Sequence, residues 1–253
     1  MSRNISQPST ARAWQRRAVK PLAALASVAA ALTAASPAVA KPLTPAAPTA
    51  KKAYVAKIVV KTAARAQPGS GPVVARLATT AALYGGANEL LITETARKGR
   101  RLFVRVLLPS RPNDATGWVN ADQVVIRKTN ARIVVDISER TVTLMQAGRQ
   151  VARSSAVVGA SSTPTPEGLF AVSEIITQPR NSELGRQVIA LTSHSDVHRT
   201  FAGGDGRVAL HSYERLGDRL GSTASNGCVR LPARFVKRLA RAAGPGTPVL
   251  VTP

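Results

Sequence analysis

Apolar positions between Val55 and Ile126 come in short runs that turn-forming residues separate. These runs predict strands over Ile58–Val60, Val73–Leu77, Leu90–Thr93, Leu102–Leu107, and Trp118–Val119 continuing into Val124–Ile126. Segments 67–72 and 109–114 are rich in Gly, Pro, Ser, Asn and Asp, which favour turns. The pattern is typical of a small all-β barrel, and we expect Trp118 to be a core aromatic of that barrel rather than a ligand platform.

A second β pattern begins at Arg132 and predicts a meander followed by one helix. A Pro-rich loop, Thr163–Gly168, interrupts the strands. Pro232 suits a first helical turn, and Gly244-Pro245 suits a helix end, so we expect a helix over Pro232–Ala243 with one apolar and one basic face. The predicted strands are Ile133–Ile137, the alternating segment around Val142 and Leu144, Val151–Val158, Leu169–Ile176, Arg207–Leu210 and Gly246–Val251.

The first 40 residues have the three parts of a secretory signal peptide. Five Lys and Arg residues and no acids precede or flank an apolar run, Leu22–Ala35, and the sequence Ala38-Val39-Ala40 follows it. The run is about 14 residues long, below the roughly 20 that a membrane-spanning helix needs. We therefore predict cleavage after Ala40 rather than a membrane anchor, and a Pro/Ala-rich linker over residues 41–54.

The net charge of the 253-residue chain is +22, with 35 Lys and Arg against 13 Asp and Glu. Such a charge first suggests an anionic polymer, and nucleic acid is the usual case. Removal of the five basic residues before Ala40 leaves 30 against 13, or +17, on an exported protein. Outside the cytoplasm the available anions are envelope polymers, so we expect these rather than nucleic acid, unless the charge serves only solubility.

The chain has one cysteine, Cys228, which excludes an internal disulfide framework. A lone cysteine is either a small buried hydrophobe or a reactive thiol. Gly227 permits close backbone approach beside the sulfur, Arg230 places a cation nearby, and His211 ends an apolar strand. Because a free thiol has a pKa of about 8.5, a histidine that accepts its proton would make it a nucleophile. Such chemistry also needs an acceptor that orients the histidine, and oxyanion donors, for which the N–H groups of residues 226–228 are candidates.

These residues carry a resemblance to the L,D-transpeptidase family. His211 is followed, after residues 212–224, by Ser225-Asn226-Gly227-Cys228-Val229-Arg230-Leu231. This arrangement, with Ser212 directly after the histidine, is similar to the catalytic signature of that family. The loop Thr163–Gly168 matches a second family motif, and the likeness covers about residues 131–252. In residues 55–128, Arg101–Val106 followed by Gly117-Trp118-Val119 resembles a bacterial Src-homology-3-like (SH3-like) domain.

The resemblance implies a mainly β protein: a β-sandwich catalytic domain with one or two short helices, preceded by a small SH3-like barrel. It implies an exported cysteine acyltransferase of the periplasm or cell wall that crosslinks peptidoglycan stem peptides without a metal or cofactor. Many family members have a second histidine where this chain has Asn226. By the same resemblance, Cys228 is the nucleophile, His211 is the general base, and the Ser212 carbonyl orients His211. Ser225, Asn226 and Gly227 line the pocket, and Arg230 supports the loop or receives a carboxylate of the substrate.

Two other functions fit the same residues. The first is an L,D-carboxypeptidase, in which water takes the acyl group. The second is a non-catalytic wall-binding protein with a buried thiol. A zinc site made by His194, His198 and Cys228 is a weaker alternative, because the segment Ser193–Arg199 lacks a helical pattern. We expect His194 and His198 to be loop residues near the substrate cleft.

Overall fold

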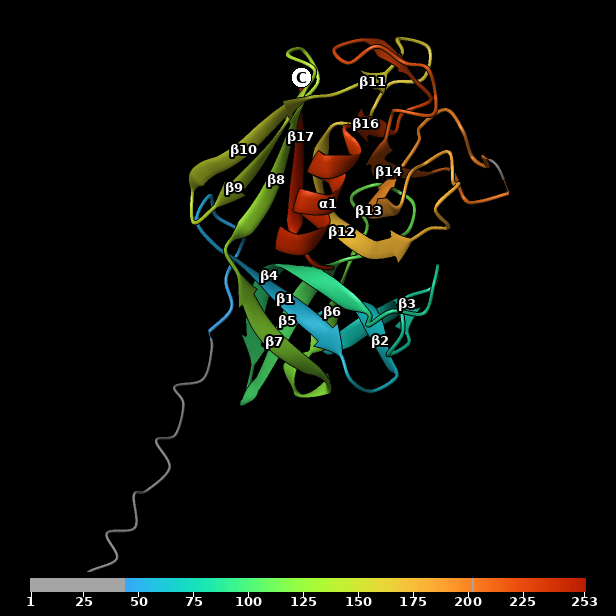
Figure 1. Cartoon of the computed structure of the whole chain (residues 1–253). Coiled ribbons are helices and arrows are strands. Elements are labelled where there is room, and N and C mark those ends of the chain that lie inside the picture. Colours follow the sequence, from blue (N-terminus) through green and yellow to red (C-terminus); the bar gives the residue numbers. More distant parts are fainter. Residues whose placement is uncertain (1–43, 202) are drawn as a thin grey trace, which may run out of the picture. The chain divides into compact units, whose positions relative to one another are not determined.

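The computed structural model describes residues 44–201 and 203–253 (Figure 1). The predicted signal peptide lies outside these residues. Strands dominate the described part, and its single α-helix, α1 (Ala233–Ala242), is ten residues long. Within the same residues, no helix has the length and apolarity that crossing a membrane requires. The prediction of a mainly β fold is confirmed.

Residues 53–129, here the N-terminal unit, form one antiparallel sheet in the order β3-β2-β6-β5-β4-β1-β7. Its core comes from alternate residues of adjacent strands, such as Ile92, Val104 and Val119. Trp118 is buried, as predicted. The elements are β1 (Ala53–Ile58), β2 (Thr62–Gln67), β3 (Ser70–Leu77), β4 (Glu89–Lys98), β5 (Arg101–Leu107), β6 (Thr116–Asn120), the short 3-10 helix η1 (Ala121–Gln123) and β7 (Val124–Thr129).

The first strand lies earlier than predicted. β1 ends at Ile58, and Val59 and Val60 are exposed, so the strand prediction Ile58–Val60 was wrong by about five residues. The strand also begins within the segment 41–54 that we interpreted as linker. Residues Ala53–Ala56 are all buried, because β1 pairs with β4 and β7 and the rest of the chain covers its outer face. Burial on both faces removes the alternation by which a sequence signals a strand.

Residues 131–252, here the C-terminal unit, form an eight-stranded sheet in the order β10-β9-β8-β17-β12-β13-β14-β16. Two neighbouring pairs, β8–β17 and β14–β16, are parallel. A short parallel pair, β11–β15, lies apart from that sheet. The strands are β8 (Ala131–Asp136), β9 (Thr141–Gln146), β10 (Arg149–Ser155), β11 (Val158–Gly159), β12 (Gly168–Thr177), β13 (Gln187–His194), β14 (Arg207–Ser212), β15 (Thr223–Ser225), β16 (Val229–Leu231) and β17 (Pro248–Thr252).

One large core lies in the C-terminal unit. It takes residues from β8 and β9, from β13, β14 and β16, and from the apolar face of α1, where Phe235, Val236 and Leu239 are buried. The helix therefore lies against the sheet as its sequence pattern predicts (Figure 1). The predicted strand Val151–Val158 is interrupted instead, because Val157 leaves β10 to pair with Arg230. Strand β13 was not predicted from the sequence.

A shared apolar cluster joins the two units. Ala53, Leu91 and Leu107 of the N-terminal unit pack against Ala171 of β12. Gly246 touches β1 so closely that a Cβ atom there would lie 2.3 Å from the Val55 side chain. The buried carboxylate of Glu174 accepts hydrogen bonds from the backbone of the N-terminal unit's β3–β4 loop. The two separate sheets are thus packed against each other through buried contacts.

Candidate active site

The parallel pairing of β14 with β16 brings the two predicted reactive residues together. Leu210 pairs with Val229 and His211 with Arg230. Leu210 and Val229 point into the core, so the next residues along each strand point to the opposite face. Cys228 immediately precedes β16 and shares that face with His211. From ordinary strand spacings the Cα atoms of Cys228 and His211 lie about 8 Å apart, a separation that the two side chains can bridge.

His211 is held in one tautomer by the backbone. Its Nδ1 atom lies 2.9 Å from the carbonyl oxygen of Ser212. Because a carbonyl oxygen can only accept a hydrogen bond, Nδ1 carries the proton and Nε2 has the basic lone pair. The imidazole is 3 % exposed, which restricts its rotation. The orienting contact expected of the Ser212 carbonyl is therefore present.

The loop before Cys228 is held by its own hydroxyl and by the Pro-rich loop. Ser225 Oγ accepts a hydrogen bond from the Gly227 N–H (3.2 Å) and donates one to the Cys228 carbonyl (2.5 Å). Thr165 Oγ1 donates to the Gly227 carbonyl (3.0 Å), and Thr163 Oγ1 donates to the Ser225 carbonyl (3.0 Å). Gly227 has φ +103°, a conformation that residues with a Cβ rarely adopt. The two motifs found in the sequence are thus in direct contact.

The three residues expected to line a pocket differ in exposure. Asn226 is exposed, whereas Ser225 and Gly227 are buried. Ser225 is fully buried with its hydroxyl bound inside the loop, which favours a role in shaping that loop. The Gly227 N–H donates to Ser225 Oγ, so it is not one of the free oxyanion donors that the sequence suggested. Their contacts with substrate stay a prediction.

Arg230 forms an ion pair that the sequence did not reveal. Its guanidinium contacts the Asp218 carboxylate, and both side chains are largely buried. Arg230 also exchanges two backbone hydrogen bonds, each 2.9 Å, with Val157. These contacts fasten the segment before Cys228 to β16 and to the end of β10. Asp218 lies in a polar stretch that offered no pattern by which to identify it.

The other two histidines lie elsewhere. His194 is the last residue of β13 and is buried, and its Nε2 lies 3.1 Å from Asp205. The prediction that His194 is a loop residue was therefore wrong, because the register of β13 with β14 extends to it. His198 does lie in a loop and packs against Phe201. In the ranges 44–201 and 203–253, no three His, Cys, Asp or Glu residues are grouped as metal ligands.

Comparison with known families decides the fold family. Residues 130–251 match the YkuD family model, which describes the L,D-transpeptidase catalytic domain. These residues form an L,D-transpeptidase catalytic domain. The resemblance found from the sequence over residues 131–252 is thereby confirmed. The likeness of residues 55–128 to an SH3-like domain stays a prediction.

Solved L,D-transpeptidases are also similar to this chain, whereas no curated protein matches it. The catalytic domain of an Enterococcus faecium enzyme is 22% identical over 48% of this chain and 96% of its own, with a TM-score of 0.38. A longer crystal structure of that enzyme is 21% identical over 48% and 49%, with a TM-score of 0.37, so this chain spans about half of its length. A Mycobacterium smegmatis L,D-transpeptidase is 18% identical over 63% and 99%, with a TM-score of 0.37.

The electrostatics of the L,D-transpeptidase domain favour neutral forms of both reactive groups. Burial raises the pKa of the Cys228 thiol, and a backbone hydrogen bond at Ala209 and the charge of Arg230 only partly offset that increase. Burial lowers the pKa of His211 to about 4, although its hydrogen bond with Ser212 acts in the opposite direction. At neutral pH Cys228 is therefore a thiol and His211 a neutral imidazole. Proton transfer from sulfur to Nε2 would accompany attack on a substrate.

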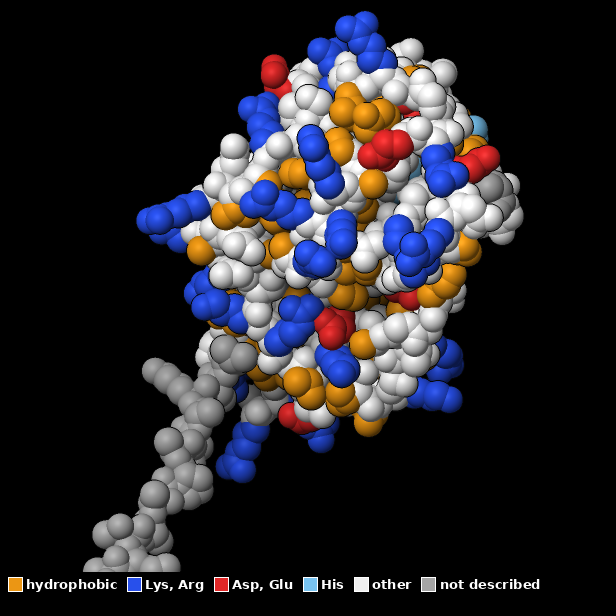
Figure 2. All heavy atoms as spheres, viewed as in Figure 1, with side chains coloured by type: hydrophobic (Ala, Val, Ile, Leu, Met, Phe, Trp, Pro, Cys, Tyr) orange, Lys and Arg blue, Asp and Glu red, His pale blue; other side chains and the backbone are white. Residues whose placement is uncertain are grey.

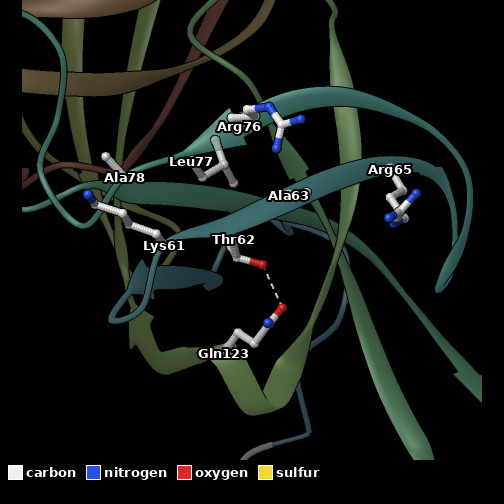
Figure 3. Close-up of a pocket in the computed structure, with 8 residues that line it drawn as sticks. All are labelled: Lys61, Thr62, Ala63, Arg65, Arg76, Leu77, Ala78 and Gln123. Atoms are coloured by element: carbon white, nitrogen blue, oxygen red, sulfur yellow. Dashed lines mark hydrogen bonds between the residues drawn. The ribbon is translucent and has the colours of Figure 1, made fainter.

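A surface pocket lies away from the candidate reactive residues of this domain. It has a volume of about 610 Å³ and lies on the N-terminal unit between β2, β3 and η1. Figure 3 shows its basic side chains, Lys61, Arg65 and Arg76, spread along the two strands, with Thr62 bonded to Gln123 (2.6 Å). None of the predicted catalytic residues lines it.

Proposed function

We propose that this protein is an exported cysteine acyltransferase that crosslinks peptidoglycan stem peptides. Two observations carry the proposal: the β14–β16 register places Cys228 and His211 on one face, and the His211 Nδ1–H is bound to the Ser212 carbonyl. This arrangement supplies a nucleophile, a base with one free nitrogen, and a group that orients the base. The L,D-transpeptidase domain makes stem peptides the expected substrate class.

In the first half-reaction Cys228 Sγ attacks the carbonyl carbon of the third, L-configured residue of a tetrapeptide stem. The thiol proton moves to His211 Nε2. Backbone N–H groups near Cys228 stabilise the oxyanion. Collapse of this intermediate breaks the peptide bond, and Nε2 gives its proton to the leaving D-alanine amine. The product is a thioester on Cys228.

In the second half-reaction a side-chain amine of another stem attacks the thioester carbonyl. His211 Nε2 accepts a proton from that amine and returns it to the Cys228 sulfur as the thioester bond breaks. A new amide joins the two stems, and the site regains its starting protonation. If water replaces the amine, the same residues perform L,D-carboxypeptidase chemistry and release a tripeptide stem.

Incubation of the protein with tetrapeptide-stem muropeptides, followed by mass spectrometry, tests the proposal. We expect crosslinked dimers and free D-alanine. Tripeptide stems without dimers would assign the carboxypeptidase instead, and unchanged substrate would favour the non-catalytic wall-binding protein. Cys228→Ser is the matched control, because it keeps a hydroxyl in the place of the thiol and should form neither product.

We further propose that the N-terminal unit, as an SH3-like barrel, faces anionic polymers of the periplasm or cell wall. Residues 53–129 contain 12 Lys and Arg against 4 Asp and Glu, whereas residues 131–252 contain 15 against 9. Figure 2 shows Lys and Arg side chains spread over the visible face with few acidic ones between them. The signal peptide predicted in residues 1–40 would deliver the chain to that compartment.

A further inference from the structure

A break in strand pairing lies next to the reactive cysteine. β13 and β14 pair at Ala190 with Ala209 and again at His194 with Arg207. Four residues of β13 therefore span the same stretch as two residues of β14. Because Leu210 of β14 pairs with Val229, Ala209 lies level with Cys228, so the ladder is irregular at the level of the candidate nucleophile. An irregular ladder holds its strand less firmly than a continuous one does.

Asn113 of the N-terminal unit binds the end of β13, at the residue where its pairing with β14 resumes. The His194 N–H donates to Asn113 Oδ1 (2.7 Å), and Asn113 Nδ2 donates to the His194 carbonyl (2.8 Å). This pair of bonds resembles what a neighbouring strand would offer to His194. Asn113 Nδ2 also contacts Asp196 Oδ1 (3.1 Å). The end of β13 is thus paired to a side chain that lies 81 residues earlier in the chain.

Arg111 binds both sides of the segment that joins β13 to β14. It donates to the carbonyls of Ser195 (2.8 Å), His198 (2.9 Å) and Asp205 (3.3 Å). The first two carbonyls follow β13, and the third precedes β14. One guanidinium therefore ties together the residues that leave one strand and enter the other.

The backbone around Gly206 is tightly packed. Gly206 has φ +71°, and a Cβ atom on it would lie 2.0 Å from the His198 carbonyl oxygen. The Ser195 N–H donates to the Gly206 carbonyl (2.8 Å). Arg207, the first residue of β14, donates to the Pro109 carbonyl of the N-terminal unit (3.1 Å). The β5–β6 loop and the start of β14 are thus closely packed.

We propose that Arg111 and Asn113 are positioning residues for the Cys228–His211 pair, acting from the N-terminal unit through the start of β14. The proposal rests on the function proposed above, because it assigns these residues to the same site. The N-terminal unit then holds the end of β13 just beyond the break in its pairing with β14. Neither residue touches the reacting atoms.

The full chain with Arg111→Ala or Asn113→Ala tests this assignment. Matched controls are Arg100→Ala, an exposed arginine at the β4–β5 turn, and Asn88→Ala, whose side chain bonds within the N-terminal unit. By hydrogen exchange, we expect the β14 amides to exchange at least tenfold faster in the two test variants than in the controls. With stem tetrapeptide, we expect kcat to fall at least tenfold and the acid limb of the pH profile to move up by about one unit. A purely stabilising role would not shift that limb.

Unchanged β14 exchange together with kcat within twofold of the controls would overturn the proposal. If Arg111→Ala does not fold, Asn113→Ala and Arg111→Lys decide the matter, with Arg111→Lys expected to fall between wild type and Asn113→Ala. If the wild-type protein processes no stem peptide, the proposed function fails instead. Hydrogen exchange and the pH dependence of Cys228 alkylation by iodoacetamide then still judge the positioning role, because neither needs the substrate.

Discussion

The two units of this protein are built from strands with different connections. Every pair in the N-terminal unit is antiparallel, and β2–β3, β4–β5 and β5–β6 are successive strands. The C-terminal unit contains parallel pairs, which require long connections. His211 lies on one of these, β14–β16, and Cys228 immediately precedes β16. The comparison teaches that the N-terminal unit closes through antiparallel pairs between distant segments, such as β1–β7, whereas the candidate reactive pair comes together on parallel strands that are close in sequence.

The largest expected effect tests which of the two units carries the activity. Cys228→Ser should lower the rate of stem crosslinking at least a thousandfold, because the nucleophile is lost. Arg100→Ala in the N-terminal unit should leave the rate within twofold. A steady-state assay with muropeptides measures both, and substantial residual activity of Cys228→Ser would place the chemistry elsewhere.

A second prediction concerns how the free energy of unfolding depends on pH. Histidine titration should affect the C-terminal unit alone, because all three histidines lie in it. Burial lowers the pKa of His211 from 6.5 to about 4, so the unfolded state binds its proton at a higher pH than the folded state does. Stability is therefore lost as pH falls from about 6.5 to about 4. The His211 contribution to this loss is about 3 kcal/mol. Urea unfolding of the wild type and of His211→Gln across this range measures it.

In His211→Gln we expect a much flatter dependence of the unfolding free energy on pH between 4 and 6.5. The residual slope reports other groups, among them His194, whose pKa burial also lowers. Equal slopes in the two proteins would contradict the assignment of the pH dependence to His211.

A third prediction concerns the interface between the units. Gly246→Ala should destabilise the protein by about 2–3 kcal/mol, because its φ is +76° and the added Cβ would meet Val55. Gly217→Ala is the matched control, with φ +72° but no atom within 4 Å, and should cost only about 1 kcal/mol. Thermal unfolding compares them. Equal losses would mean that the contact between the units is loose.

The smallest expected effect tests the charge difference. Arg100→Ala with Arg101→Ala should weaken retention on an anionic wall polymer a few-fold at physiological salt, and the difference should vanish in high salt because the charges are screened. Arg234→Ala with Lys237→Ala, on the exposed face of α1, removes the same charge from the C-terminal unit and should weaken retention less. A cosedimentation assay at two salt concentrations measures both pairs. Equal effects would remove the special role of the N-terminal unit.

Elements with a strong local pattern were predictable. The helix α1 agrees with its prediction to within one residue at each end, because its apolar face, its Pro start and its Gly-Pro end all lie in one short segment. Strands β1 and β13 were not predictable in the same way. Ala53–Ala56 are buried on both faces, and seven of the eight β13 residues are buried. Such burial depends on neighbours that distant parts of the chain supply.

The candidate reactive residues could be proposed from the sequence because their motif is local. Cys228 and its neighbours lie in seven consecutive residues, and the orienting carbonyl belongs to the residue after His211. The residues that hold the motif were not predictable. Asp218 pairs with Arg230 from a polar stretch without a pattern, and Arg111 and Asn113 act from a segment interpreted only as a turn.

The amino-acid sequence alone determined the mainly β fold, the catalytic family and the identity of the candidate nucleophile and base, because strand periodicity and the Cys-His motif are carried by neighbouring residues. Only the tertiary structure decided the protonation preferences of the two reactive groups and which residues hold them. Burial sets the pKa values of His211 and Cys228, and burial arises only when β14, β16 and their covering segments pack together. The bonds from Arg111 and Asn113 likewise join residues more than 80 positions apart, and no local pattern records such a contact.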